Sequence, residues 1–403
     1  MTSWCASLSR TPVSKVAFGA ATGSTGGTGP GGDDDMLRAH AQPSDPRSTV
    51  VWQLTRQSMS CAAMGSPLSA FLLSRAAADV LEDGPCAELL LRDVRPGRGD
   101  AMALRFLAAL HRMVLDRQAP LLALHYPSVG GTPSLRQVGD VMVHTVEHGG
   151  DRLAELLAQP CQTNEVGRAA GLIVGLLDVA AVTGLPLSLR EVGASAGLNL
   201  RLDRFAYEVP TGEGDEVRVL GPPDAELRFT GQYRAPLPGN PTALPVIADR
   251  LGCDLHPIDP TTPEGRARVS SAVWPDQTDR FERLGAALRT AARVAATVEH
   301  ASAAEWIERQ LAARATGVTT VVLHSVVREY MPAAERARFQ EALEVAGAAA
   351  TADAPVAHVQ LEPVSALRSA GITVRIWPHA PEPRVLATCG AHGTDIRPRA
   401  ESS

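Results

Sequence analysis

A glycine-rich turn follows a hydrophobic run at residues 187–205, LSLREVGASAGLNLRLDRF. The run is typical of a buried strand, and Gly193 and Gly197 bracket the turn that follows it. Glycines at such a place let the backbone approach a ligand closely, and a following helix offers unpaired N–H groups. Glu191 stands just before the first glycine, where a carboxylate suits a cationic group such as an α-ammonium. The pattern predicts a ligand site at the end of this strand.

The same five residues, Gly193 to Gly197, also satisfy G-x-S-x-G, the nucleophile elbow of α/β-hydrolases. In that hypothesis Ser195 is the nucleophile, and a later acid and a later histidine complete a triad. A buried Glu191 beside an oxyanion site counts against it. So does the helical upstream half, because the hydrolase needs strands before the elbow. The candidate acids are Asp259 and Glu362, and the candidate bases are His379 and His392.

The segment from His144 to His148, HTVEH, matches H-x-x-E-H, an inverted zinc-protease pattern. On a helix the two histidines share one face, as a zinc pair requires. However, Gly149 and Gly150 would end the helix at the second histidine, and no residue is nominated as the third ligand. We therefore interpret the segment as an exposed helix face and predict no metal site.

Polar residues also gather in the N-terminal half, notably in QTNE at 162–165. Asn164 and Arg168 are one helical turn apart and so share a helix face. Capping with an inter-helix polar network explains this cluster as well as substrate contact does. Trp274 begins the segment WPDQ, in which Asp276 is expected near the positive end of its own helix. The candidates for substrate contact are Tyr126, Asn164, Arg168 and Trp274.

Composition narrows the class of protein. The chain has 403 residues, 45% of them hydrophobic, and a formal net charge of −6. A mild negative charge argues against nucleic-acid binding, which rests on a basic face. The longest apolar run, 169–182, is too short to span a membrane. Six scattered cysteines without a C-x-x-C pair fit a reducing compartment. We expect a cytoplasmic protein with a small-molecule substrate, no nucleic-acid partner and no membrane partner; the oligomeric state stays open.

The chain divides into four segments. Residues 1–48 are rich in Gly, Thr, Ser and Asp and are expected to form a disordered leader. Residues 49–185 have the apolar spacing of amphipathic helices. Residues 186–397 alternate strand-like and helical runs, which predicts a mostly parallel α/β sheet. Residues 398–403 are a disordered tail.

Within the α/β segment, residues 205–240 break the alternation with short strands and many prolines and glycines, and are interpreted as an insertion. The last two strand-like runs, 372–378 and 384–390, are separated by a short turn and predict an antiparallel pair at one edge of the sheet. Another strand is expected at 253–259, CDLHPID.

This layout resembles the Rossmann-like class I methyltransferase fold, which binds S-adenosylmethionine. Residues 50–397 are also similar to a bacterial family defined only as a domain of unknown function. The segments that carry this second resemblance include GSPLSAFLLSRAAADV, HYPSVGG, QTNEVGRAAGL, LREVGASAGLNLRLDR, RLGCDLHPIDPTTPEGR, VWPDQTDR and VVLHSVVREYMPAAERARF.

The methyltransferase resemblance implies roles for particular residues. Glu191, Gly193, Ser195 and Gly197 would line the methionine part of the cofactor, with Ala194 and Asn199 of the same turn beside them. Asp259 would hold the ribose hydroxyls. Ser302 and Ala303 would lie beside the adenine, while His324 and Ser325 would face the transferred methyl group. His324 would be the general base where the acceptor has a proton to lose, and the helical segment would cover the cleft as a lid.

The leading hypothesis is therefore an S-adenosylmethionine-dependent methyltransferase acting on a small molecule. Two alternatives remain. One is a methyltransferase-like protein that binds a nucleotide or metabolite without turnover, and the other is a serine hydrolase that uses Ser195.

Overall fold

The computed structural model describes residues 45–92, 101–364 and 369–399. Most of the expected leader, and residues 400–403 of the expected tail, lie outside these ranges. All described residues belong to one compact unit, residues 43–403. The helical segment and the α/β segment are therefore described together.

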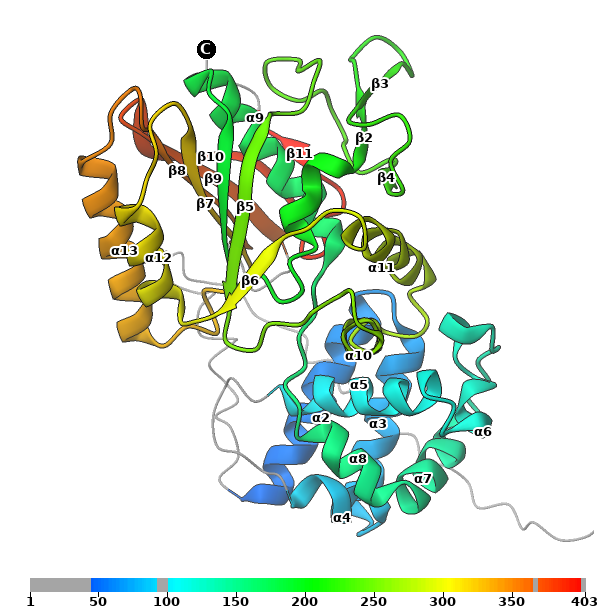
Figure 1. Cartoon of the computed structure of the whole chain (residues 1–403). Coiled ribbons are helices and arrows are strands. Elements are labelled where there is room, and N and C mark those ends of the chain that lie inside the picture. Colours follow the sequence, from blue (N-terminus) through cyan, green and yellow to red (C-terminus); the bar gives the residue numbers. More distant parts are fainter. Residues whose placement is uncertain (1–44, 93–100, 365–368, 400–403) are drawn as a thin grey trace, which may run out of the picture. The chain divides into compact units, whose positions relative to one another are not determined.

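A single sheet of eight strands forms the centre of the α/β segment, in the order β11-β10-β9-β8-β7-β1-β5-β6 (Figure 1). Neighbours from β6 to β8 pair in parallel, and β9, β10 and β11 continue the sheet in antiparallel pairs. This confirms the predicted mostly parallel sheet with antiparallel C-terminal strands. The strands are β1 (Leu187–Val192), β5 (Ile247–Asp254), β6 (Thr297–His300), β7 (Thr319–Ser325), β8 (Val356–Pro363), β9 (Ser369–Trp377), β10 (Ala380–Gly390) and β11 (Arg397–Pro398).

Strand β1 lies between β5 and β7 among the parallel strands. Glu191 pairs with Gly252 of β5 on one side and with Leu323 of β7 on the other. Because parallel strands end at a common edge, the carboxyl ends of β1, β5 and β7 meet there, where open α/β sheets bind ligands. All eight strands come from residue 187 onward. The hydrolase hypothesis requires strands before the elbow, and the described residues upstream supply none to this sheet.

Helices cover both faces of the sheet. Helices α9 (Ala169–Thr183) and α11 (Thr278–Ala291) pack on one face, and α12 (Ala303–Ala312) and α13 (Ala333–Ala348) pack on the other. Glycines bring α9 close to the strands: a Cβ added to Gly175 would lie 2.5 Å from Cγ1 of Val359. Thus α9 belongs to the core of the sheet, although it lies within the segment predicted to be a helical unit.

The same stretch, Val166–Thr183, is the one part of the described chain that is long and apolar enough to cross a membrane. However, 61% of that window is buried inside the structure. This is the pattern of a core helix in a soluble protein, because its apolar side chains are already covered by the sheet.

The helices before α9 build a second hydrophobic core of their own. The first of them starts at Pro46, inside the expected leader, because the Asp45 side chain accepts a hydrogen bond from the N–H of Ser48 and caps the helix. These helices are α2 (Pro46–Ala63), α3 (Pro67–Leu81), α4 (Pro85–Leu91), α5 (Met102–Leu115), α6 (Pro120–Ala123), α7 (Val138–His148) and α8 (Gly150–Leu157).

The segment before α11 ties this second core to the α/β segment. Asp276 accepts hydrogen bonds from the N–H of Leu68, at 2.8 Å, and from the hydroxyl of Ser66. It therefore caps α3, although it also lies just before the N-terminus of α11, where the sequence placed it. The imidazole Nδ1 of His111 in α5 is 2.9 Å from the carbonyl oxygen of Val273. Trp274 completes the attachment by packing into the helical core.

The predicted insertion at 205–240 folds into a small three-stranded sheet, β3-β2-β4, with helix α10 (Pro263–Ser271) following later in the chain. The rings of Tyr207 and Phe229 stack across it, with centroids 5.2 Å apart. The strands are β2 (Ala206–Pro210), β3 (Val217–Leu220) and β4 (Arg228–Phe229).

We expect Asp276→Ala to lower the free energy of unfolding by about 1–3 kcal/mol, because it removes the cap of α3 and leaves two donors without an acceptor. Urea unfolding followed by circular dichroism measures the change. Asp279→Ala is the matched control, since Asp279 is exposed and lies in the first turn of α11. An equal or larger loss for Asp279→Ala would show that the acidic group acts on α11 instead.

Candidate functional site

A cavity of about 850 Å³ lies at the carboxyl ends of β1, β5, β6 and β7. Its far side is formed by residues of α2 and α5, so both cores contribute to it. The volume is at the upper end of the range for small-molecule and cofactor sites. Ten of the residues predicted for cofactor or substrate contact line it: Glu191, Gly193, Ser195, Asn199, Ser302, Ala303, Ser325, Asn164, Arg168 and Trp274.

The glycine turn is built by backbone that only glycine adopts easily. Gly193 has a φ of +70° and Gly197 one of +65°. A Cβ added to Gly193 would lie 2.4 Å from Cγ2 of Val327, so the next strand's loop packs directly against the turn. Ser195 between them also has a positive φ, +53°, which is uncommon for a residue other than glycine and is frequent at functional sites.

The N–H groups of this turn are bonded to the protein. Those of Gly193 and Ala194 donate to the carbonyl oxygen of Cys253, and that of Ser195 donates to Oδ2 of Asp254 at 2.8 Å. The turn continues into a short 3-10 helix, η3 (Asn199–Arg204), rather than an α-helix. The expected row of free N–H groups is therefore not formed, and the turn is poorly suited to an anion such as phosphate.

Two side chains of the QTNE segment hold the turn in place. Oδ1 of Asn164 accepts hydrogen bonds from the N–H groups of Ala196 (3.2 Å) and Leu198 (3.0 Å). Nε2 of Gln162 donates to Oδ1 of Asp254 at 2.6 Å. Asn164 thus both lines the cavity and positions the turn, while Ala194 and Gly197 lie in the body of the turn and do not reach the cavity wall.

Glu191 carries the most perturbed carboxyl group of the cavity wall. It is 2% exposed, and its Oε2 atom has no hydrogen-bond partner. Burial raises the pKa of Glu191 to about 8, and the negative charge of Asp254 adds to the effect. The neighbouring oxygen atoms Oγ of Ser195 and Oδ1 of Asn199 are also buried without partners. Buried polar atoms are nearly always bonded, so these three oxygen atoms indicate a polar ligand that forms hydrogen bonds with them.

The acid at the end of β5 is Asp254, not Asp259 as expected. Strand β5 runs from Ile247 to Asp254, and the expected strand at 253–259 begins where it ends. Asp259 is exposed and does not line the cavity; its carboxylate accepts from the N–H of Thr261 at 2.9 Å. Asp254 does line the cavity.

Next to Asn164, the cavity is lined by a group of charged and aromatic residues that the sequence did not single out together. Glu165 bonds to Arg280 through its Oε2 atom and to the N–H of Gly167 through Oε1. Burial opposes ionisation, but the charges of Arg280, of Arg168 and, at the low pH where Glu165 titrates, of His392 outweigh it and lower the pKa of Glu165 to about 2. Burial lowers the pKa of His392 to about 4, so its imidazole is neutral near pH 7.

His324 does not line the cavity, which corrects its expected place beside a transferred group. It is 0% exposed. Its Nδ1 atom is 2.7 Å from Oε1 of Glu362, and its Nε2 atom is 3.0 Å from Nε2 of His358. Successive side chains of a strand point to opposite faces, so Ser325 reaches the cavity and His324 does not. Glu362 also accepts from the N–H of Val327 at 3.0 Å, so the buried pair supports the loop that packs on Gly193.

Other predicted groups lie away from the cavity or do not assemble. Tyr126 is 1% exposed within the helical core. Oγ of Ser195 has no hydrogen-bond partner, and Glu362 is engaged with His324, so no Ser-His-acid triad is present among the described residues.

The HTVEH segment lies at the end of α7, outside the cavity. The possible ligand atoms of His144, Glu147 and His148 are within 4.8 Å of one another, and all three residues are exposed. Helix α7 ends at His148, as the two following glycines predict.

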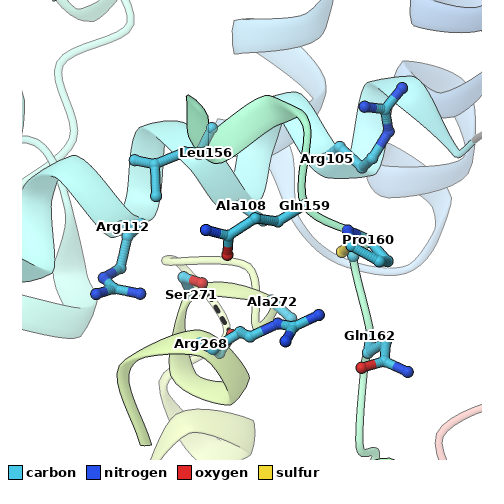
Figure 2. Close-up of a pocket in the computed structure, with 12 residues that line it drawn as sticks. Arg105, Ala108, Arg112, Leu156, Gln159, Pro160, Gln162, Arg268, Ser271 and Ala272 are labelled. Atoms are coloured by element: carbon cyan, nitrogen blue, oxygen red, sulfur yellow. Dashed lines mark hydrogen bonds between the residues drawn. The ribbon is translucent and has the colours of Figure 1, made fainter. Parts of the chain in front are cut away.

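A small side pocket of about 20 Å³ adjoins the main cavity and shares Arg105 and Gln162 with it. Figure 2 shows the guanidinium of Arg268 extending from α10 toward the segment that carries Pro160 and Gln162. Nε of Arg268 and Oε1 of Gln162 are both buried without partners. A volume of this size holds about one water molecule.

We expect Asn164→Ala to lower the free energy of unfolding by about 1–3 kcal/mol, because two buried N–H groups of the turn lose their acceptor. Chemical denaturation measures the change, and Thr163→Ala is the control from the same segment. Crystallographic or amide-exchange comparison of the variant should show the change confined to the turn. If the amide hydrogens of Ala196 and Leu198 exchange at an unchanged rate, Asn164 does not hold the turn through these two hydrogen bonds.

The chain belongs to the family described as "Uncharacterized protein conserved in bacteria (DUF2332)", which it matches over residues 52–397. This match spans both the helical segment and the α/β segment. No curated protein and no solved structure matches the chain.

Proposed function

We propose that the cavity binds S-adenosylmethionine and that this member of the family is a methyltransferase acting on a small molecule. The observation that carries the proposal is the group of unpartnered oxygen atoms at the end of β1: Oε2 of Glu191, Oγ of Ser195 and Oδ1 of Asn199. A ligand with several N–H donors and a positive charge, such as an α-ammonium, satisfies them. The bonded N–H groups of the turn disfavour a phosphate at the same place.

The cavity residues fit the remaining parts of this cofactor. Asp254, in place of Asp259, would bind the ribose hydroxyls, since it ends the strand next to β1 and lines the cavity. Ala301, Ser302 and Ala303, which follow β6, would border the adenine. When bound, the cofactor supplies a methyl group on a sulfonium centre.

The protein's contribution to such a transfer is to hold the two reactants in line and to exclude water. The acceptor would lie toward α2, α5 and Trp274, on the side of the cavity that the helical segment covers. His324 is not part of this proposal as a base, because it is buried away from the cavity. His392 is the neutral imidazole on this side.

A binding protein without turnover is the second candidate. The specific observation in its favour is that His324, the expected base, does not reach the cavity. Release of S-adenosylhomocysteine from S-adenosylmethionine on a panel of small-molecule acceptors distinguishes the two. For either function we place the protein in the cytoplasm, in accord with its five described free cysteines.

We expect Glu191→Gln to weaken the binding of S-adenosylhomocysteine about 10- to 100-fold, because the ligand's ammonium loses its charged partner. Isothermal titration measures the dissociation constant. Glu299→Gln, on β6 and outside the cavity, is the matched control and should bind as the wild type does. Absence of binding by the wild-type protein at high concentration would overturn the proposed function.

Binding should also depend on pH. With the pKa of Glu191 at about 8, the carboxyl group of the ligand-free protein is mostly neutral below that pH and must lose a proton to pair with an ammonium. Affinity is therefore expected to rise about tenfold per pH unit between roughly pH 6 and 8 and then level off. The same titration with Glu191→Gln should be nearly flat over this range. An equal slope in both proteins would show that another group controls binding.

A further inference from the structure

Arg168 lies at the cavity wall with little to neutralise its charge. Its Nε atom donates to the carbonyl oxygen of Ala391 at 3.1 Å, and Nη1 donates to that of Ser325 at 3.3 Å. Both acceptors are uncharged. Within residues 45–92, 101–364 and 369–399, no carboxylate oxygen lies within ion-pair distance of this guanidinium, and its second Nη atom makes no hydrogen bond.

The acids around Arg168 are already engaged. Glu165 is bonded to Arg280 and to the N–H of Gly167, and Glu362 is bonded to His324. The groups that act most strongly on Arg168 electrostatically are these two acids, Arg280 and Tyr330, and Glu191 interacts with it as well; burial itself lowers the pKa of Arg168. A partly buried cation without a carboxylate at ion-pair distance favours an anionic ligand group beside it.

Atoms with the opposite requirement line the same cavity at the end of the neighbouring strand β1. There Oε2 of Glu191 and Oδ1 of Asn199 lack donors. Arg168 is near enough to Glu191 to stabilise its ionised form. A ligand that carries an ammonium and a carboxylate on one carbon would supply a donor to Glu191 and an acceptor to Arg168.

We propose that Arg168 binds the α-carboxylate of the amino-acid part of the cofactor while Glu191 binds its α-ammonium. This inference rests on the proposed function and deepens it, since the pair would select a zwitterionic α-amino acid group. A planar guanidinium with a free Nη atom suits a carboxylate, and its two carbonyl contacts fix its orientation. Arg168 was expected from sequence to contact the substrate, and the inference assigns it to the cofactor instead.

The test compares two ligands by isothermal titration: S-adenosylhomocysteine and its analogue that lacks only the α-carboxylate. The wild-type protein should bind the complete ligand about 10- to 100-fold more tightly, the usual value of a hydrogen bond between charged groups. This comparison needs no variant, so it does not depend on the folding of an altered protein.

Arg168→Gln should bind both ligands with nearly equal affinity, because the glutamine amide retains a donor for Ala391 but has no charge. Arg168→Lys should keep part of the preference. Arg338→Gln, which removes an exposed arginine paired with Glu308 on the outer helices, should behave as the wild type does. Thermal unfolding of each variant confirms that it is folded.

The outcomes separate the two proposals. If the wild-type protein binds S-adenosylhomocysteine but binds the decarboxylated analogue equally well, the role of Arg168 is overturned and the proposed function stands. The same holds if Arg168→Gln keeps the full preference, which would assign the guanidinium to an anionic group of the acceptor. If neither ligand binds the wild-type protein, the proposed function fails and this inference fails with it.

Discussion

The N–H groups of the glycine turn donate their hydrogen bonds to the protein itself, and this determines what the cavity can bind. The acceptors belong to Cys253 and Asp254 of β5 and to Asn164 in the segment before α9. A turn left open, with its N–H groups pointing outward, would attract an anion. Here the donors are directed into the protein, and the groups left over are oxygen atoms. The polarity of this end of the cavity is therefore reversed relative to a phosphate-binding turn.

That reversal explains why a carboxylate is tolerated at the end of β1. Glu191 is held between two strands and under the turn, and burial costs its charged form enough to move its pKa to about 8. Without a ligand, the Glu191 carboxyl group stays protonated near neutral pH, so no buried charge has to be stabilised. A cationic ligand changes the balance because it replaces the missing solvation with a direct charge pair. Ionised Glu191 is therefore energetically unfavourable only when no cationic ligand is bound.

Much of the fold was predictable from sequence, but which residues of each strand point toward the cavity was not. The run LSLREV and the strand–helix alternation after it indicate a parallel sheet, and the glycines mark the turn correctly. Strand β5 was misplaced because its first half, IADR, is polar and partly exposed, so the pattern placed the strand around CDLHPID and missed Asp254. His324 and Ser325 are adjacent in a strand buried on both faces. Hydrophobicity alone does not tell which face meets the cavity. The contacts of Asn164 and Gln162 join residues far apart in sequence, and no local pattern records them.

The attachment of the helical segment bears on how the site works. Asp276 caps α3, Trp274 lies in the helical core, and Arg112 of α5 pairs with Glu264 of α10 at Nη1–Oε1 2.8 Å. Trp274 also lines the cavity, so the residues that fasten the helices are continuous with those that would meet a ligand. Opening the helical segment as a hinged lid would break these contacts together and expose apolar core. These contacts favour a helical segment that stays in place over the cavity rather than one that opens as a hinged lid.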